Sequence, residues 1–131
     1  MHPNHRMDVG KHTKVLIVED DVVSRTALDL LLTASGYATT AVASAEEALR
    51  VVQNDPEPMV AVVDVDLPGM SGLDLLERLE HDRRSLPAIL VTATNRDSMG
   101  DWVEERGVPH LRKPVDFRLL LSVLSEQAPA D

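Results

Sequence analysis

The chain has 131 residues, which is the length of a single domain, and 44% of them are hydrophobic, which argues against a disordered protein. The formal net charge of −9 argues against nonspecific binding to nucleic acid and to anionic membranes. Because the chain has no cysteine, disulfides, thiolate metal sites and cysteine nucleophiles are excluded. The N-terminus does not resemble a signal peptide and no apolar stretch is long enough to span a membrane, so a cytoplasmic protein is expected.

Short aliphatic runs alternate with helical patterns over residues 14–127, between expected tails at 1–13 and 128–131. The expected strands are 15–18, 38–42, 59–63, 88–92 and 109–112. The expected helices are 22–35, 45–53, 72–82 and 97–106, with a last helix after Asp116. Continuous apolar strands that alternate with helices predict an α/β domain, in which a doubly wound five-stranded parallel sheet is covered on both faces.

Individual residues mark the ends and the buried faces of these helices. Gly36 stops the first helix, and Ser44 with Glu47 forms a capping box for the second. The expected buried face of the first helix consists of Val23, Ala27, Leu30, Leu31 and Ala34. The expected buried face of the last helix consists of Phe117, Leu120, Leu121 and Leu124.

Polar side chains stand at the carboxyl ends of the predicted strands. They are Glu19 and Asp20 after the first strand, Asp64 after the third, Thr92 on the fourth and Lys113 after the fifth. Because parallel strands end at one edge of a sheet, where α/β proteins bind ligands, these side chains are expected around one small pocket. The acids indicate a cation site, a reactive carboxylate or both. Mg²⁺ prefers such oxygen ligands, and the hydroxyl and ammonium suit the oxygens of a phosphoryl group.

Four segments together resemble the receiver domain of two-component response regulators. They are VLIVEDD (15–21), VVDVDLPGMSG (62–72), VTA (91–93) and KP (113–114), in this order and at appropriate spacing. The resemblance covers nearly everything from Lys14 to Gln127. It implies a flavodoxin-like (βα)5 fold with strand order 2-1-3-4-5.

The resemblance also implies a role for each acid of the predicted pocket. Asp64 matches the aspartate that accepts a phosphoryl group from a histidine kinase or a histidine phosphotransfer protein. Glu19 and Asp20 match the acid pair that holds Mg²⁺ together with Asp64, and the backbone carbonyl of Asp66 matches the remaining protein ligand. Apart from its carbonyl, Asp66 is expected to be either a turn residue or an acid whose side chain lies behind the metal ligands.

Thr92 matches the hydroxyl residue that moves toward the phosphoryl group, and Lys113 matches the lysine that pairs with it. By the same resemblance, the peptide bond between Lys113 and Pro114 is expected to be cis. Receiver domains often carry an aromatic residue on the fifth strand, and here the nearest match is His110. A histidine there could switch by rotamer or protonation, or be structural.

Other residues have simpler interpretations or concern partners. Asp21 is expected to cap a helix, and Ser71 to have a structural role. Candidate contacts for a downstream protein are Trp102, Leu119 and Val123, with incidental surface packing as the alternative. We expect a monomer or a weak homodimer that does not bind nucleic acid or membranes.

The leading functional hypothesis is a single-domain receiver that is phosphorylated and signals by protein contact, rather than a turnover enzyme. The receiver segment of a hybrid histidine kinase is an alternative. A second class is a small Mg²⁺-dependent phosphatase with a DxD motif, in which Asp64 is the nucleophile and Asp66 the acid. A third hypothesis is a pseudo-receiver, which binds partners without phosphorylation.

Overall fold

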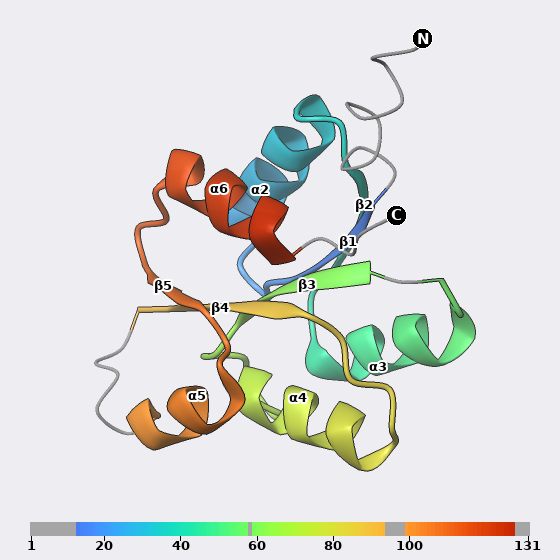
Figure 1. The fold of residues 1–131 in the computed structure, drawn as a ribbon. Helices are drawn as coiled ribbons and strands as arrows, with labels where there is room; N and C mark the ends of the chain where they lie inside the picture. The colour runs from blue at the N-terminus through green and yellow to red at the C-terminus, as the bar shows by residue number, and fades with distance from the viewer. Residues whose placement is uncertain (1–12, 58, 94–98, 128–131) are drawn as a thin grey trace, which may run out of the picture.

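The computed structural model describes residues 13–57, 59–93 and 99–127, which form a parallel sheet between two layers of helices. The strands are β1 (Lys14–Val18), β2 (Ala38–Val42), β3 (Met59–Asp64), β4 (Ala88–Thr92) and β5 (His110–Arg112). The helices are α2 (Val22–Ala34), α3 (Ala45–Asn54), α4 (Gly72–His81), α5 (Gly100–Arg106) and α6 (Phe117–Gln127). Helices α2 and α6 cover one face of the sheet, and α3, α4 and α5 cover the other (Figure 1).

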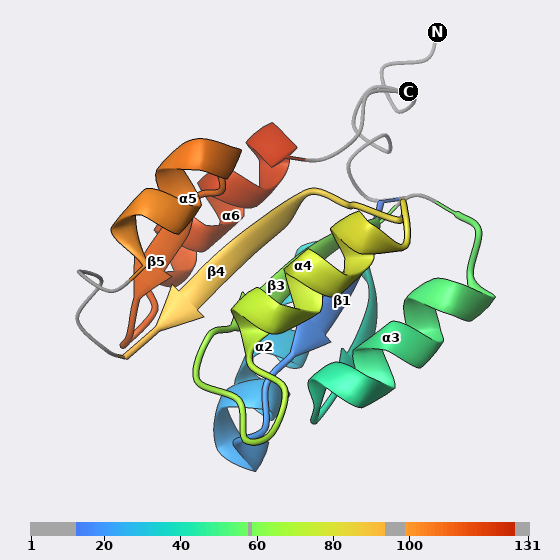
Figure 2. The same cartoon turned by 90° about the horizontal axis from the view of Figure 1, so that it is seen from below.

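The strand order is β2-β1-β3-β4-β5, which confirms the predicted topology. All neighbouring strands are parallel, and Val18 of β1 pairs with Val63 of β3. The carboxyl ends of β1 and β3 therefore lie side by side at one edge of the sheet, as the parallel arrows of Figure 2 illustrate. This register brings the acids that follow the two strands close together.

The core consists of two apolar clusters, one on each face of the sheet. Successive strand residues point to opposite faces, so Leu16 and Val18 join the cluster under α3, α4 and α5. Val15 and Ile17 of the same strand join the cluster under α2 and α6. Because both faces are covered, β1, β3 and β4 need no polar alternation and read as continuous apolar runs.

The buried face of α2 differs from the prediction. The helix buries Leu28 and Leu32, whereas Val23 is 76% exposed and Leu30 is 68% exposed. The segment from Ala27 to Leu32 is apolar at all positions but one, so spacing alone does not select a face. The face is fixed by contact with the sheet.

The last helix also differs at its first residue. Leu120 and Leu124 are fully buried and Leu121 is partly buried, as predicted. Phe117 is 41% exposed and lines a surface groove instead of the core. The expected core position of Phe117 is therefore wrong.

Several predicted boundaries lie partly or wholly outside the described residues. These include the tails at 1–12 and 128–131 and the start of the fourth predicted helix at Asp97; the described part of that helix is Gly100–Arg106. Thr13, the last residue of the predicted N-terminal tail, is buried, and its carbonyl accepts a hydrogen bond from the backbone N of Ala38 (3.4 Å). None of the described helices is both long and apolar enough to cross a membrane.

Candidate functional site

Three carboxylates meet where β1 and β3 end. Glu19 and Asp20 follow β1, Asp64 is the last residue of β3, and each offers an oxygen within 4.8 Å of the others. Glu19 and Asp64 are buried, at 2% and 4% exposure, whereas Asp20 is exposed. The structure therefore brings together the acids that the sequence placed in one pocket.

The loop that carries Glu19 and Asp20 is held by the beginning of α2. Asp21 caps this helix, since its side chain accepts a hydrogen bond from the backbone N of Ser24 (2.9 Å). One guanidinium nitrogen of Arg25 donates to the backbone carbonyls of Glu19 (2.9 Å) and Asp20 (3.2 Å). Sequence reasoning gave Arg25 no role. The only signal in the sequence that could have indicated a role for Arg25 is its position, as a cation in the first turns of the helix that follows Glu19 and Asp20.

Lys113 supplies the positive charge of the pocket. Its Nζ lies 3.1 Å from Oε1 of Glu19 and 3.1 Å from Oδ2 of Asp64. Its backbone N donates to the carbonyl of Thr92 (2.9 Å), which fixes the end of β5 against β4. The peptide bond from Lys113 to Pro114 is cis, as predicted.

Burial and pairing shift the pKa values of two of these groups. Burial raises the pKa of Glu19, and the hydrogen bonds from the backbone of Asp21 and from Lys113 only partly offset this effect. Burial by itself would lower the pKa of Lys113, but its hydrogen bonds with Glu19 and Asp64 outweigh burial and raise it. Lys113 therefore remains a cation at neutral pH and compensates part of the buried negative charge.

The carboxylate of Asp66 lies against the end of β4. Thr92 is fully buried, and its hydroxyl donates to Oδ2 of Asp66 (3.3 Å). The backbone N of Ala93 donates to the same oxygen (3.2 Å), and the backbone N of Asp66 donates to Oδ1 of Asp64 (2.8 Å). Thr92 thus belongs to the pocket, and Asp66 connects it to Asp64.

The turn after β3 packs tightly against Asp64. Ser71 caps α4 in a reciprocal capping box with Asp74, which confirms its structural role. A Cβ on Gly72 would lie 2.4 Å from the backbone oxygen of Asp64, so this position requires glycine. The sequence contained Gly72 within a recognised motif, but only the folded chain shows why a side chain does not fit.

The donor set fits a magnesium ion. Glu19, Asp20 and Asp64 provide hard carboxylate oxygens on adjacent strand ends, and such oxygens, completed by water, are the ligands that Mg²⁺ prefers. The cluster has two buried carboxylates, one exposed one and a single ammonium, so its negative charge exceeds its positive charge. A divalent cation would balance that excess.

Comparison with known proteins shows the family to which the chain belongs. Residues 15–125 match the family described as the response regulator receiver domain. The chain belongs to this family. A CheY-like receiver domain of Methanospirillum hungatei superposes with a TM-score of 0.78 and 30% identity, over 88% of this chain and 96% of that one.

Longer regulators are similar to the receiver in sequence. It is 36% identical over 107 residues to the transcriptional regulatory protein AfsQ1 of Streptomyces coelicolor, covering 81% of this chain and 47% of that protein. It is 39% identical over 92 residues to the two-component response regulator PhoP of Pseudomonas aeruginosa, covering 70% and 38%. The receiver chain therefore spans less than half the length of these two relatives.

His110 is the first residue of β5, the outermost strand of the sheet next to β4. It pairs with Leu90, two residues before Thr92 on β4. Because alternate residues of a strand share a face, His110 and Thr92 lie on the same side of the sheet. This backbone position is compatible with the switch role suggested for His110, which stays a prediction.

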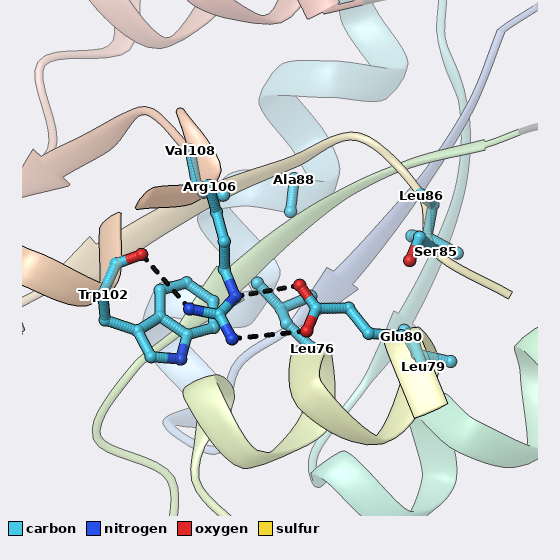
Figure 3. A pocket seen from close by; sticks show the side chains of 9 residues that line it. All are labelled: Leu76, Leu79, Glu80, Ser85, Leu86, Ala88, Trp102, Arg106 and Val108. Carbon is cyan, nitrogen blue, oxygen red and sulfur yellow. Dashed lines mark hydrogen bonds and ion pairs between the residues drawn. The ribbon is translucent and has the colours of Figure 1, made fainter. Parts of the chain in front are cut away.

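The predicted partner contacts of the receiver lie on both sides of the sheet. Trp102 is on α5, and its indole N–H donates to Glu77 of α4 (2.9 Å). The Arg106 guanidinium lies 4.1 Å from the centroid of the Trp102 ring and donates twice to Glu80, at the edge of a cleft of about 170 Å³ (Figure 3). These contacts tie α5 to α4.

Leu119 and Val123 belong to α6, on the opposite face of the sheet (Figure 1). Leu119 is 48% exposed, whereas Val123 is partly buried against the cluster under α2 and α6. The structure does not bring Trp102 and this pair together into one surface. Binding of a downstream protein to any of the three stays a prediction.

Proposed function

We propose that Asp64 accepts a phosphoryl group from a phosphohistidine of a histidine kinase or phosphotransfer protein, and that the receiver then signals through protein contacts. The observation that supports this most is the Asp64 carboxylate at the strand edge, with Lys113 3.1 Å away and two further acids within 4.8 Å. In the step, a carboxylate oxygen of Asp64 forms a bond to phosphorus while the phosphorus–nitrogen bond of the donor breaks. The imidazole leaves with that electron pair.

Each pocket residue has a defined part in this chemistry. Lys113 places its ammonium where it neutralises charge on the attacking carboxylate and on the incoming phosphoryl oxygens. The Thr92 hydroxyl and the Ala93 backbone N are hydrogen-bond donors at the neighbouring strand end. Glu19, Asp20 and Asp64, with the backbone carbonyl of Asp66, would hold Mg²⁺, which when bound neutralises phosphoryl oxygens.

A surface groove beside the pocket suits a protein donor. The groove has a volume of about 490 Å³, lies between α2 and the segment from β5 to α6, and has Glu19 and Lys113 in its lining. Val23 and Phe117 also line it and are 76% and 41% exposed. Exposed apolar side chains next to a charged reaction centre are the expected features of a surface that binds a protein donor.

The alternatives have less support. The DxD phosphatase hypothesis places the nucleophile on the strand that opens its fold, whereas Asp64 ends the third strand of a sheet with order β2-β1-β3-β4-β5. A receiver domain is typically a phosphoacceptor rather than a turnover enzyme. The complete set of Asp64, Lys113, Thr92 and the acid pair argues against a pseudo-receiver. By analogy with the family, we propose a cytoplasmic location.

Intact mass spectrometry after incubation with acetyl phosphate tests the proposal. We expect one phosphoryl adduct that requires Mg²⁺, is absent in EDTA and is lost in Asp64→Asn. Glu104→Gln, which removes an exposed acid of α5, is the matched control and should be modified like the wild type. Folded wild-type protein that is modified neither by acetyl phosphate nor by a phosphohistidine protein would support the pseudo-receiver instead.

The same assay separates the donor surface from the reaction centre. We expect Val23→Lys to slow phosphorylation by a phosphohistidine protein by at least tenfold, because a charge then occupies the apolar groove. Modification by acetyl phosphate should remain unchanged, because this small donor does not need the apolar groove. Equal rates with the protein donor for the wild type and Val23→Lys would rule out this groove.

A further inference from the structure

The side chain of Asp66 occupies hydrogen-bond donors that a phosphoryl group on Asp64 would need. Its Oδ2 accepts from the hydroxyl of Thr92 (3.3 Å) and from the backbone N of Ala93 (3.2 Å). Both donors stand where β4 ends, next to the end of β3 that carries Asp64. Two donors on one carboxylate oxygen form a small anion-binding site that Asp66 already fills.

Asp66 and a phosphoryl group compete for the same protons. A Thr hydroxyl and a backbone N–H each provide one proton, so neither donates fully to two anions at once. Thr92 is fully buried, so a phosphoryl group would have to take its hydroxyl proton from Asp66 inside the pocket. The carboxylate of Asp66 and a phosphoryl group are both negatively charged, and their proximity would add repulsion to this competition.

The position of Asp66 distinguishes this role from metal binding. Among the described residues, the group whose carboxylate oxygens lie within 4.8 Å of one another contains Glu19, Asp20 and Asp64 but not the side chain of Asp66. Asp66 instead bridges β3 to β4, because its backbone N donates to Asp64 (2.8 Å) while its carboxylate accepts from the end of β4.

Given the phosphorylation of Asp64 proposed above, on which this inference rests, we propose that Asp66 is a positioning residue and an internal competitor of the phosphoryl group. Before phosphorylation, Asp66 holds the Thr92 hydroxyl and the Ala93 N–H toward the pocket. When a phosphoryl group is attached to Asp64, the Asp66 carboxylate must leave both donors. The competition weakens phosphoryl binding while keeping the donors oriented for it.

Beryllium fluoride binds an aspartate carboxylate as an anionic trifluoroberyllate group that mimics a phosphoryl group, and it measures this competition in the full chain at saturating Mg²⁺. We expect Asp66→Ala to lower the half-saturating concentration about three- to tenfold. Asp66→Asn keeps an acceptor oxygen without the charge, so its effect should be smaller. Glu104→Gln removes an acid on α5 and should bind like the wild type.

The amide proton of Ala93 reports the hydrogen bond directly in ¹⁵N-labelled protein. In the unmodified wild type its resonance should lie downfield because it donates to a carboxylate. Asp66→Ala should move the resonance upfield, and beryllium fluoride should return it downfield. A separate Mg²⁺ titration, which shows the metal saturation of each variant, excludes a metal effect.

Two results would overturn the inference while leaving the proposed function intact. One is an Ala93 resonance that does not move in Asp66→Ala. The other is an unchanged or higher half-saturating concentration in Asp66→Ala, although the wild type still forms its Asp64-dependent adduct. A wild type that forms no adduct with any donor would overturn both the proposed function and the role of Asp66.

Discussion

Neutralising Asp20 should stabilise the protein when no divalent cation is present. Asp20 has an oxygen within 4.8 Å of an oxygen of Glu19 and of Asp64, and the described residues give its side chain no salt bridge. Asp20→Asn therefore removes two repulsive pairs of charges. The hydrogen bond from the Arg25 guanidinium to the backbone carbonyl of Asp20 is kept. Among the described residues the Asp20 side chain accepts no hydrogen bond, so its neutralisation leaves no donor unpaired.

The magnitude follows from the distance and the exposure of Asp20. Two unit charges 4.8 Å apart repel by about 0.9 kcal/mol in a water-like dielectric, which suits an exposed side chain. Screening by salt and the favourable interaction of Asp20 with the N-terminus of α2 reduce the sum of both pairs. We expect the free energy of unfolding to rise by about 1 kcal/mol, or the melting temperature by about 4 °C.

The assay is urea unfolding in EDTA and again in Mg²⁺, followed by circular dichroism. In Mg²⁺ at ten times its dissociation constant, the wild type should gain about 1.4 kcal/mol, and Asp20→Asn should gain less because it lacks one ligand. Glu104→Gln, on α5, should change by less than about 0.5 kcal/mol in both buffers. An Asp20→Asn variant that is no more stable than the wild type in EDTA, or that gains as much from Mg²⁺, would refute the reasoning.

Three further predictions concern the core, the turn after β3 and alkaline pH. In urea unfolding, Leu32→Ala should lower the free energy of unfolding by about 2–5 kcal/mol, because Leu32 is fully buried. Leu30→Ala on the same helix should change it by less than about 0.5 kcal/mol, because Leu30 is exposed. Gly72→Ala should cost about 1–3 kcal/mol and reduce the phosphoryl adduct seen by mass spectrometry, because its Cβ would lie 2.4 Å from the backbone oxygen of Asp64. The raised pKa of Lys113 means that its stabilising contribution is complete below the ordinary lysine value of 10.5 and is lost as pH rises through the raised value. Urea unfolding from pH 9 to about 11 should show a larger loss in the wild type than in Lys113→Met, which keeps the loss from Lys14, whose pKa is also raised by its hydrogen bonds with Asp55 and Glu57.

Each of these has an outcome that would contradict it. Equal losses for the two leucine variants would mean that α2 packs through another face. A fully phosphorylated and stable Gly72→Ala protein would mean that the turn has room for a side chain. A Lys113→Met variant with the same alkaline loss as the wild type would assign that loss to other groups.

Strand and helix positions were largely predictable because local patterns determine them. β1, β3 and β4 lie between two helical layers, and their apolar runs follow from burial on both faces. The capping residues Asp21, Ser44 and Ser71 act through backbone N–H groups within three residues, so sequence spacing is sufficient to find them. The boundaries of β2 and β4 were confirmed to the residue.

The faces of helices were less predictable, because they depend on what each helix packs against. In α2, an almost continuous apolar run allowed several faces, and the sheet selected Leu28 and Leu32. Phe117 sits in the first turn of α6, where the groove rather than the core receives its side chain. Hydrophobicity indicates that a residue tends to be buried, but not whether the neighbouring element reaches it.

The amino-acid sequence by itself determined the alternating fold, the strand order implied by its resemblance and the set of acids, hydroxyl and ammonium at the strand ends. Their polar side chains interrupt apolar runs, which is a local signal. Only the tertiary structure decided that Asp66 accepts hydrogen bonds from Thr92 and Ala93, and that Gly72 contacts Asp64. Contacts between the ends of different strands depend on register and turn geometry at the scale of an ångström, and no pattern along the chain records that distance.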